Sequence, residues 1–328
     1  MPPQKKLLCC DWGTSAFRLL LVDVSTSRVQ AMDETDQGIA RTFKLWQQSV
    51  ATTASRKDFY LGYIEARIAI LEKLINSSLK GVPLILSGMA SSSVGIEELP
   101  YKALPFAVNG SDAVVKSYKV PTAMRGIFLV SGVKSKDDEV MRGEETLLIG
   151  SASEDSQQKE TWFIFPGTHS KHVFVSNGHA TELRTFMTGE FFELLTRHSI
   201  LALSVSQSGD FGQEKTKENF VSGVLKGLRS NLLHSCFSVR TNKLFHHCND
   251  HENYYFLSGL LIGTELSVLP REPANLVLVC GISLGPLYET ALEVLKADGR
   301  KLTYSYRSAE EALIQGQLKI HSLLDKRP

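Results

Sequence analysis

The chain has 328 residues and a formal net charge of +1, with 43% hydrophobic and 22% charged residues. This length predicts about two domains. Because the net charge is nearly zero, the protein has no overall positive field to attract nucleic acid or an anionic membrane. No apolar stretch reaches the roughly 18 residues of a membrane span, and Asp11 interrupts the first one, so we expect neither a span nor a secretory leader. Five cysteines, an odd number without metal-ligand pairing, favour free thiols and a cytoplasmic location.

The beginning of the chain predicts a hairpin with a small-residue turn. Apolar runs at 6–10 and 17–24 are typical of two strands, and a Gly-Thr-Ser turn lies between them at 13–15. Asp11 follows the first strand and Arg18 begins the second. Backbone N–H groups in such a turn can approach an anion closely. A carboxylate, this turn and an arginine therefore indicate a phosphate group with a divalent metal, and hence nucleotide handling.

The next segment predicts a helix, a short strand and a candidate binding loop. Apolar residues at helical spacing predict a helix over 58–79, which Gly81 and Pro83 end. Residues 84–86 are typical of a buried strand, and the small residues of 87–93 form a loop after it. In open α/β sheets, ligands bind at loops that follow the carboxyl ends of strands.

A polar linker separates two halves. A strand at 127–130 and a helix entered from a loop at 141–150 complete the first half. The polar residues 151–160 predict a linker. We therefore expect an N-terminal domain of residues 1–150 and a C-terminal domain of residues 151–328, with the terminal helix free to pack back on the first domain.

The second half repeats the design of the first. Strands at 161–165 and 171–175 flank another Gly-Thr turn. The other expected elements are a strand at 276–279 and helices at 189–203, 217–235, 252–269, 286–298 and 308–324. Gly259 and Gly263, four residues apart, favour close helix packing. Alternating strands and helices in both halves predict an α/β architecture.

Three turns resemble the nucleotide motifs of the actin-like ATPase superfamily, which includes sugar kinases, actin and the heat-shock-70 chaperones. Asp11–Arg18 looks like the first phosphate motif, Pro166–Thr168 like the second, and Leu278–Ser283 like the adenosine motif. The resemblance implies a two-domain actin-like (ribonuclease H-like) ATPase fold with an interdomain cleft. Closure of that cleft would exclude water from the reaction.

Five ordered blocks resemble the 2-dehydro-3-deoxygalactonokinase family more narrowly, and the resemblance covers nearly the whole chain, from Cys10 to about Ile320. The blocks are Ser87–Met89, Met141–Thr146, Pro166–Lys171, Phe186–Glu190 and Phe256–Gly263. The resemblance implies a transferase that uses ATP and Mg²⁺ to phosphorylate the 6-hydroxyl of 2-dehydro-3-deoxy-D-galactonate in galactonate catabolism. It also implies that the first domain mainly binds the sugar acid and the second mainly ATP. His172, where a tryptophan is expected, and Ile282, where a small or hydroxyl residue is commoner, depart from the pattern.

Three residues are the candidates for catalysis. Asp11 is the expected metal ligand, because a carboxylate at a strand end can hold Mg²⁺ directly or through water. Arg18 could clamp a terminal phosphate. Glu144 is the expected base, as an acidic residue at a comparable position serves in related sugar kinases, while Glu145 and Glu190 stay open as rivals. We expect the helix N-terminus to lower the pKa of a glutamate there and keep it ionised.

Nucleotide and substrate contacts are expected at the turns and their neighbours. The expected nucleotide-binding residues are Gly13, Thr14, Ser15, Gly167, Thr168, Lys171, Gly281, Ser283 and Gly285. The expected sugar-acid-binding residues are Ser87, Gly88, Ser91, Arg142, Glu145, His169 and Glu190.

Ordinary structural explanations stay open beside these roles. Asp11 could be a turn residue, Arg18 a surface ion pair, Lys171 a strand-edge lysine, and Glu190 a helix cap. Residues 246–251 contain three histidines and a cysteine, but their spacing matches no common zinc site.

Other functions also stay open. They are a kinase of another small sugar acid or polyol, a non-catalytic sugar or nucleotide sensor of the same fold, and a filament former or chaperone. The expected partners are the sugar acid and ATP, with no nucleic acid and no membrane, and a homodimer is left open.

Overall fold

The computed structural model describes residues 5–49, 55–120, 124–153, 159–207 and 210–325. The chain forms two compact units. Unit 1 comprises Met1–Gln158, Val175–Leu183 and Ala309–Pro328, and unit 2 comprises Lys159–Phe174 and Arg184–Ser308. Part of the expected linker, residues 154–158, lies outside the described residues.

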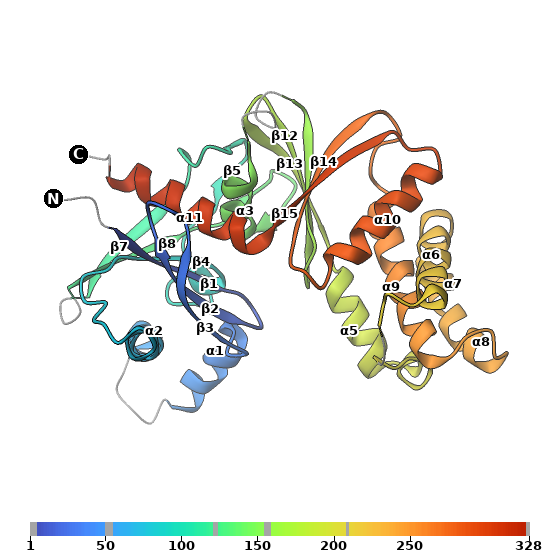
Figure 1. The fold of residues 1–328 in the computed structure, drawn as a ribbon, viewed down its shortest axis with the longest axis horizontal. Coiled ribbons are helices and arrows are strands. Elements are labelled where there is room, and N and C mark those ends of the chain that lie inside the picture. Colours follow the sequence, from blue (N-terminus) through green and yellow to red (C-terminus); the bar gives the residue numbers. More distant parts are fainter. Residues whose placement is uncertain (1–4, 50–54, 121–123, 154–158, 208–209, 326–328) are drawn as a thin grey trace. The chain divides into compact units, whose positions relative to one another are not determined.

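The main sheet of unit 1 has the strand order β3-β2-β1-β4-β8-β7 (Figure 1). Its strands are β1 (Lys6–Trp12), β2 (Phe17–Asp23), β3 (Val29–Thr35), β4 (Leu84–Gly88), β8 (Arg125–Val130) and β7 (Val115–Val120). The first three strands pair antiparallel, and β1, β4 and β8 run parallel. The expected hairpin, the strand at 84–86 and the strand at 127–130 are therefore confirmed.

Helices cover both faces of this sheet, with α2 and α11 on opposite sides (Figure 1). The helices of unit 1 are α1 (Ile39–Gln48), α2 (Arg56–Ile75), α3 (Glu144–Ser151) and α11 (Ala309–Asp325), with a 3₁₀ turn at Met89–Ser91. The core includes Trp12 and Phe17 from the hairpin and Tyr60 and Ile64 from α2. A small sheet, β10-β9-β5, contains Val140–Met141, Val133–Lys134 and Lys102–Ala103.

Unit 2 repeats the strand order of unit 1. Its sheet runs β15-β14-β11-β12-β13, which matches β8-β4-β1-β2-β3 strand for strand. The strands are β11 (Thr161–Phe165), β12 (Ser170–Ser176), β13 (His179–Phe186), β14 (Ala274–Cys280) and β15 (Leu302–Ser308). The far end of the β12–β13 hairpin belongs to unit 1, where β6 (Phe106–Ala107) pairs with β13. The α/β class is confirmed, with the same sheet built twice.

The helices of unit 2 differ from the expectation at two places. They are α5 (Thr188–His198), η2 (Ile200–Ser204), α6 (Glu214–Arg229), α7 (Leu232–Cys236), α8 (Ser238–Leu244), α9 (Asp250–Leu266) and α10 (Gly285–Ala297). The single helix expected at 217–235 is wrong, because the Asn231 side chain accepts from His234 N and starts α7. The helix expected at 189–203 likewise stops at His198, and the Ser199 hydroxyl caps a 3₁₀ segment.

Several elements were not expected from the sequence. They include α1, α8, the strands β3, β7, β13 and β15, and the two-residue strands β5, β6, β9 and β10. Strand β3 is mostly exposed, so the buried alternation that marks a strand is missing from it. No helix in the described part of the chain is long and apolar enough to cross a membrane.

Close packing of α6 on α9 fixes the helical layer of unit 2. An ideal Cβ at Gly259 would lie 2.1 Å from Phe220 O, and one at Gly263 would lie 2.3 Å from Val224 O. In the opposite direction, a Cβ at Gly223 would lie 2.1 Å from Phe256 O. The expected close packing at Gly259 and Gly263 is confirmed, and it requires small residues on both helices.

We predict that Gly259→Ala lowers the free energy of unfolding by about 1–3 kcal/mol, because the added methyl forces the two helices apart. Denaturant unfolding followed by circular dichroism measures the change. Gly62→Ala on α2 is the matched control, since a Cβ there meets nothing within 4 Å. The control should be neutral or stabilising by up to about 1 kcal/mol, and equal effects of the two substitutions would contradict the packing argument.

Candidate active site

The chemistry-bearing residues of unit 1 gather where β1 and β4 end. The strand register places Asp11 opposite Arg18 on β2 and opposite Ser87 on β4. Because β1 and β4 are parallel, Asp11 and Ser87 lie at the carboxyl edge of the sheet, where α/β folds bind ligands.

Two glycines bring the start of α3 to this edge. Gly88 has φ +86°, and an ideal Cβ there would lie 2.8 Å from Trp12 O and 3.0 Å from Asp11 Oδ1. Gly143 has φ +112°, and its Cβ would lie 3.2 Å from the Gly88 Cα. Both positions therefore need glycine, for conformation and for space. The result is that Glu144, the first residue of α3, lies near enough to Asp11 to affect its ionisation.

The electrostatics of this edge favour a bound cation. Burial raises the pKa of Asp11 to about 6, Arg18 opposes that shift, and the nearby Glu144 adds to it. Two carboxylates that disfavour each other's charge would both be stabilised by a divalent cation between or beside them. The residues present thus fit a site for a hard, oxygen-liganded cation.

Glu144 and Glu145 point into different surroundings. Glu144 is half-buried and accepts a hydrogen bond from Arg142 N at 2.9 Å. Glu145 is only 1% exposed and accepts from Gly143 N at 2.7 Å and from Thr146 Oγ1 at 3.0 Å. Burial, with Glu144 beside it, raises the pKa of Glu145 to about 8. The expectation that the helix N-terminus lowers the pKa is therefore wrong for Glu145, because desolvation outweighs the hydrogen bonds.

Arg142 anchors the loop after β4. Its guanidinium donates to the backbone carbonyl of Ser91, to Ser91 Oγ at 2.6 Å and to Tyr101 OH at 3.3 Å. It also lies over the Tyr101 ring, with Cζ 4.1 Å from the centroid. The structure thus brings together Arg142 and Ser91, two of the expected sugar-acid-binding residues. Most of the N–H donors of Arg142 are bonded within the protein.

A glutamine from the far end of the chain supports Asp11 and Ser87. Gln317 on α11 is fully buried, and its Nε2 donates to Cys10 O and to Ser87 Oγ, both at 2.8 Å. Ser87 is fully buried as well. Sequence reasoning missed Gln317, because a glutamine in an amphipathic helix gives no local signal of a contact 230 residues away.

Backbone contacts fix the first small-residue turn. Gly13 N donates to Ala16 O at 2.9 Å, and Thr14 and Ser15 are exposed. The start of α1 packs on this turn, with Ile39 N donating to Gly13 O at 2.9 Å. Arg18, on the return strand, pairs with Glu34 at 2.9 Å while its side chain stays 31% exposed. Backbone and hydroxyl donors of the turn are therefore available to an anion, and Arg18 is partly committed to Glu34.

The second Gly-Thr turn lies in unit 2 against the start of α5. A Cβ at Gly189 would lie 2.5 Å from Gly167 O, and Glu190 N donates to Thr168 O at 3.0 Å. The side chains of His169 and Glu190 form a hydrogen-bonded pair. Four expected site residues, Gly167, Thr168, His169 and Glu190, are thus brought together, and Lys171 follows on β12 with only 6% exposure.

A buried carboxylate beneath this turn was missed from the sequence. Glu265 on α9 accepts from Ser170 Oγ at 2.6 Å, His172 Nε2 at 3.0 Å and Tyr288 OH at 2.7 Å, and also from Thr188 Oγ1. We call these five residues the Glu265 network. Burial would raise the pKa of Glu265, but the bonds from His172, Ser170 and Thr188 outweigh burial and hold the pKa below its ordinary value.

The third turn leads from β14 into α10. Leu284 N and Gly285 N both donate to Gly281 O, at 3.3 and 3.1 Å, and Gly281 and Ser283 are exposed. Beside the turn is a pocket of about 470 Å³. Its lining includes Ser283, Phe211, Tyr255, Lys217 and Thr290. The pocket combines aromatic faces with polar groups, as small-molecule sites do.

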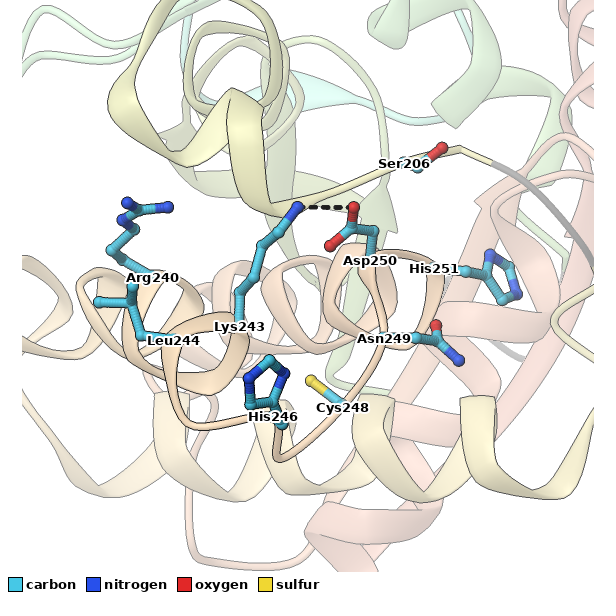
Figure 2. Close-up of a pocket in the computed structure, with 9 residues that line it drawn as sticks. All are labelled: Ser206, Arg240, Lys243, Leu244, His246, Cys248, Asn249, Asp250 and His251. Carbon is cyan, nitrogen blue, oxygen red and sulfur yellow. Dashed lines mark hydrogen bonds and ion pairs between the residues drawn. The ribbon is translucent and has the colours of Figure 1, made fainter.

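A larger hollow of about 920 Å³ lies elsewhere in unit 2 and contains no expected site residue (Figure 2). His246, Cys248 and His251 line it, but their side chains do not converge, and Lys243 pairs with Asp250 at 2.8 Å (Figure 2). In the described ranges, no three His, Cys, Asp or Glu side chains are arranged to hold a metal ion.

Comparison with known families gives one match along most of the chain. The model of the 2-keto-3-deoxy-galactonokinase family matches residues 11–320. The chain is 31% identical to a Rhizobium meliloti (strain 1021) protein assigned as 2-dehydro-3-deoxygalactonokinase DgoK1, over 86% of this chain and 87% of that protein. It is also 31% identical to the 2-dehydro-3-deoxygalactonokinase of Escherichia coli (strain K12), over 66% of this chain and 72% of that enzyme.

A solved structure resembles the whole fold. It is a crystal structure from Sinorhizobium meliloti of a protein assigned as a 2-dehydro-3-deoxygalactonokinase. The TM-score is 0.74 at 27% sequence identity, and the match covers 97% of this chain and 95% of that one.

We predict that the free energy of unfolding falls as the pH rises from 6 to 8, and that Glu145→Gln removes this slope. The folded-state pKa of Glu145 is raised from 4.5 to about 8, so the native state binds the extra proton in that range and loses the advantage as it dissociates. Asp11 contributes only below its pKa of about 6. Urea unfolding at several pH values measures the slope, and Glu98→Gln, an exposed glutamate of the same unit, should retain it.

Proposed function

This chain belongs to the 2-keto-3-deoxy-galactonokinase family, and we propose that it transfers the terminal phosphoryl group of ATP to the 6-hydroxyl of 2-dehydro-3-deoxy-D-galactonate. The observation that carries this proposal within the site is the proximity of Asp11 and Glu144 at the carboxyl edge of the unit 1 sheet. One carboxylate can bind a metal ion, and the other can accept the proton of the attacking hydroxyl. Phosphoryl transfer to an alcohol requires both roles. The expected metabolic role is galactonate catabolism in the cytoplasm.

The base in this proposal is Glu144. It is half-buried, and the bond from Arg142 N fixes its carboxylate at the start of α3. Glu145 is the weaker candidate. It is buried, it accepts a hydrogen bond from Gly143 N, and its pKa is raised to about 8. A Glu145 that is protonated at neutral pH cannot serve as the base, so Glu144 is the candidate of this pair.

Asp11 would hold Mg²⁺, directly or through its waters. The bound ion would neutralise charge on the phosphates during transfer. The fit of Mg²⁺ to Asp11 rests on its carboxylate chemistry, on the neighbouring Glu144 and on its raised pKa; Arg18, which acts against that rise, is itself paired with Glu34.

Unit 2 would bind most of the nucleotide, and unit 1 most of the sugar acid. We assign the phosphates to Gly13, Thr14, Ser15 and Arg18 of unit 1 and to Gly167, Thr168 and Lys171 of unit 2. Gly281, Ser283 and Gly285 would lie along the adenosine, whose base fits the neighbouring pocket of about 470 Å³ with its Phe211 and Tyr255 rings.

The sugar-acid contacts are proposed at two places. In unit 1 they are Gly88, the buried Ser87 and Ser91, and Glu145 behind Glu144. Arg142 is proposed to act mainly by holding the loop, because Ser91 and Tyr101 already take most of its donors. In unit 2 the His169–Glu190 pair offers both a donor and an acceptor to sugar hydroxyls.

The direct test is a coupled ADP-release assay with a panel of sugar acids and polyols. We expect ADP release with 2-dehydro-3-deoxy-D-galactonate and phosphate on its 6-oxygen, identified by NMR. A clear preference for another sugar acid would replace the substrate, and nucleotide binding without ADP release on any member would indicate a sensor. Light scattering on the same sample decides between a monomer and the homodimer left open by the sequence.

We predict that Asp11→Asn and Glu144→Gln each lower turnover by about 10²–10⁴-fold. The first removes the metal ligand and the second the base, and both preserve shape. Asp137→Asn and Glu98→Gln, at exposed positions of unit 1, are matched controls and should keep wild-type turnover. Near-normal turnover of either site variant, with an unchanged circular dichroism spectrum, would refute the role of that residue.

We also predict that the Mg²⁺ concentration needed for half-maximal activity rises several-fold as the pH falls below about 6. Asp11 becomes protonated there and loses its affinity for the cation. Because Glu144 contributes to the raised pKa of Asp11, the residual activity of Glu144→Gln should show the inflection at lower pH. An Mg²⁺ requirement that does not change with pH would contradict the assignment of Asp11.

A further inference from the structure

We propose that Glu265 is a positioning residue for nucleotide binding, which holds the second phosphate turn and the adenosine turn of unit 2 in one fixed geometry. It does so through the Glu265 network, without touching the nucleotide itself. The inference rests on the proposed function, since it takes these two turns to be the ATP-binding elements of unit 2.

Glu265 fixes the phosphate turn from both sides. Ser170 and His172, which directly follow the turn on β12, donate to one carboxylate oxygen at 2.6 and 3.0 Å. Thr188, at the start of α5, donates to the other oxygen. The next residue, Gly189, packs its backbone on Gly167. The strand that leaves the turn and the helix that covers it are therefore joined through one carboxylate.

The same carboxylate fixes the adenosine turn. Tyr288 OH donates to Glu265 at 2.7 Å, and Tyr288 lies in the first turns of α10. Its backbone N donates to Leu284 O, and Gly285 N donates to Gly281 O. A shift of Tyr288 would therefore move the turn that begins α10.

The network needs a carboxylate at this position. Glu265 is 3% exposed, and Ser170, His172, Thr188 and Tyr288 all donate hydrogen bonds to it. An ionised carboxylate accepts only, with enough lone pairs for all four bonds. An amide would turn an N–H group toward donors and leave at least one buried group unsatisfied, which is costly.

The helix that carries Glu265 is itself held in place. Gly259 and Gly263, on the same helix α9, pack directly on the backbone of α6. Because α9 cannot adjust easily, a change at Glu265 should displace the turns rather than the helix. Both turns should then lose affinity together.

The test is isothermal titration of ADP and AMP into the full-length protein and its variants. We expect Glu265→Gln to weaken ADP binding by about tenfold, as loss of a supporting hydrogen-bond partner commonly does, and to weaken AMP as well. Ser170→Ala should weaken ADP more than AMP, and Tyr288→Phe should weaken both. The KM for the sugar acid should stay unchanged in Tyr288→Phe, which disturbs the adenosine turn. It should rise in Glu265→Gln and Ser170→Ala, because His169 and Glu190 flank the phosphate turn that these variants disturb.

Asn253→Ala is the matched control for a purely structural effect. Asn253 is fully buried on the same helix and donates to Ser204 O at 2.8 Å and to Val239 O at 2.6 Å, away from both turns. It should lower the melting temperature and leave ADP affinity at the wild-type value. ADP affinity of Glu265→Gln equal to that of Asn253→Ala would overturn the proposal.

Two further outcomes are decisive. If Glu265→Gln does not fold, unchanged ADP and AMP affinity in both Ser170→Ala and Tyr288→Phe overturns the positioning role. If the wild-type protein binds ADP but phosphorylates no sugar acid, the proposed function fails while the ADP titrations still decide the role of Glu265.

Discussion

Contact between backbones without an intervening Cβ is the constraint on which both units depend. In unit 1, an ideal Cβ at Gly316 would lie 2.0 Å from Thr146 O, and one at Gly150 would lie 1.7 Å from Ala312 O, so α11 and α3 touch through their backbones. That contact sets where α3 begins, and therefore where Glu144 lies. Unit 2 uses the same device at Gly189, where the start of α5 rests on the phosphate turn. Contacts between main chains thus fix the positions of the candidate site residues, and such close contacts leave little room for rearrangement.

Three carboxylates, Asp11, Glu145 and Glu265, show how the surroundings of a side chain decide whether it is charged. Asp11 and Glu145 are desolvated beside another carboxylate, Glu144, and their pKa values are raised to about 6 and about 8. Glu265 is about as buried as Glu145, yet hydrogen bonds and the charge of its neighbours hold its pKa below the ordinary value. Burial alone therefore does not predict protonation; the neighbouring charges and hydrogen-bond donors decide it together. The first pair suits a place where a cation and a proton are exchanged, and Glu265 suits a permanent anion.

Much of the fold and the local motifs could be predicted from the sequence, because they depend on short-range patterns. The apolar runs around Asp11 and Gly167 gave the two hairpins, and the family resemblance agrees with the match over residues 11–320. Gln317 and Glu265 could not be predicted, because each acts through partners distant in sequence, and each lies in a helix whose spacing suggests only a core face. The break at Asn231 was missed because a capping residue interrupts an otherwise continuous helical pattern.

The position of α11 has a consequence for how the protein is made. This helix follows all of unit 2 along the chain, yet its Gln317 bonds Cys10 and Ser87 and its Gly316 meets α3 in unit 1. During synthesis the early strands emerge long before the helix that completes their sheet. A nascent chain therefore exposes the face of unit 1 that α11 covers until translation has passed unit 2. The sheet edge that contains Asp11 is completed only when α11 has been made. A chain that is released before that point lacks the contacts of Gln317 with Cys10 and Ser87.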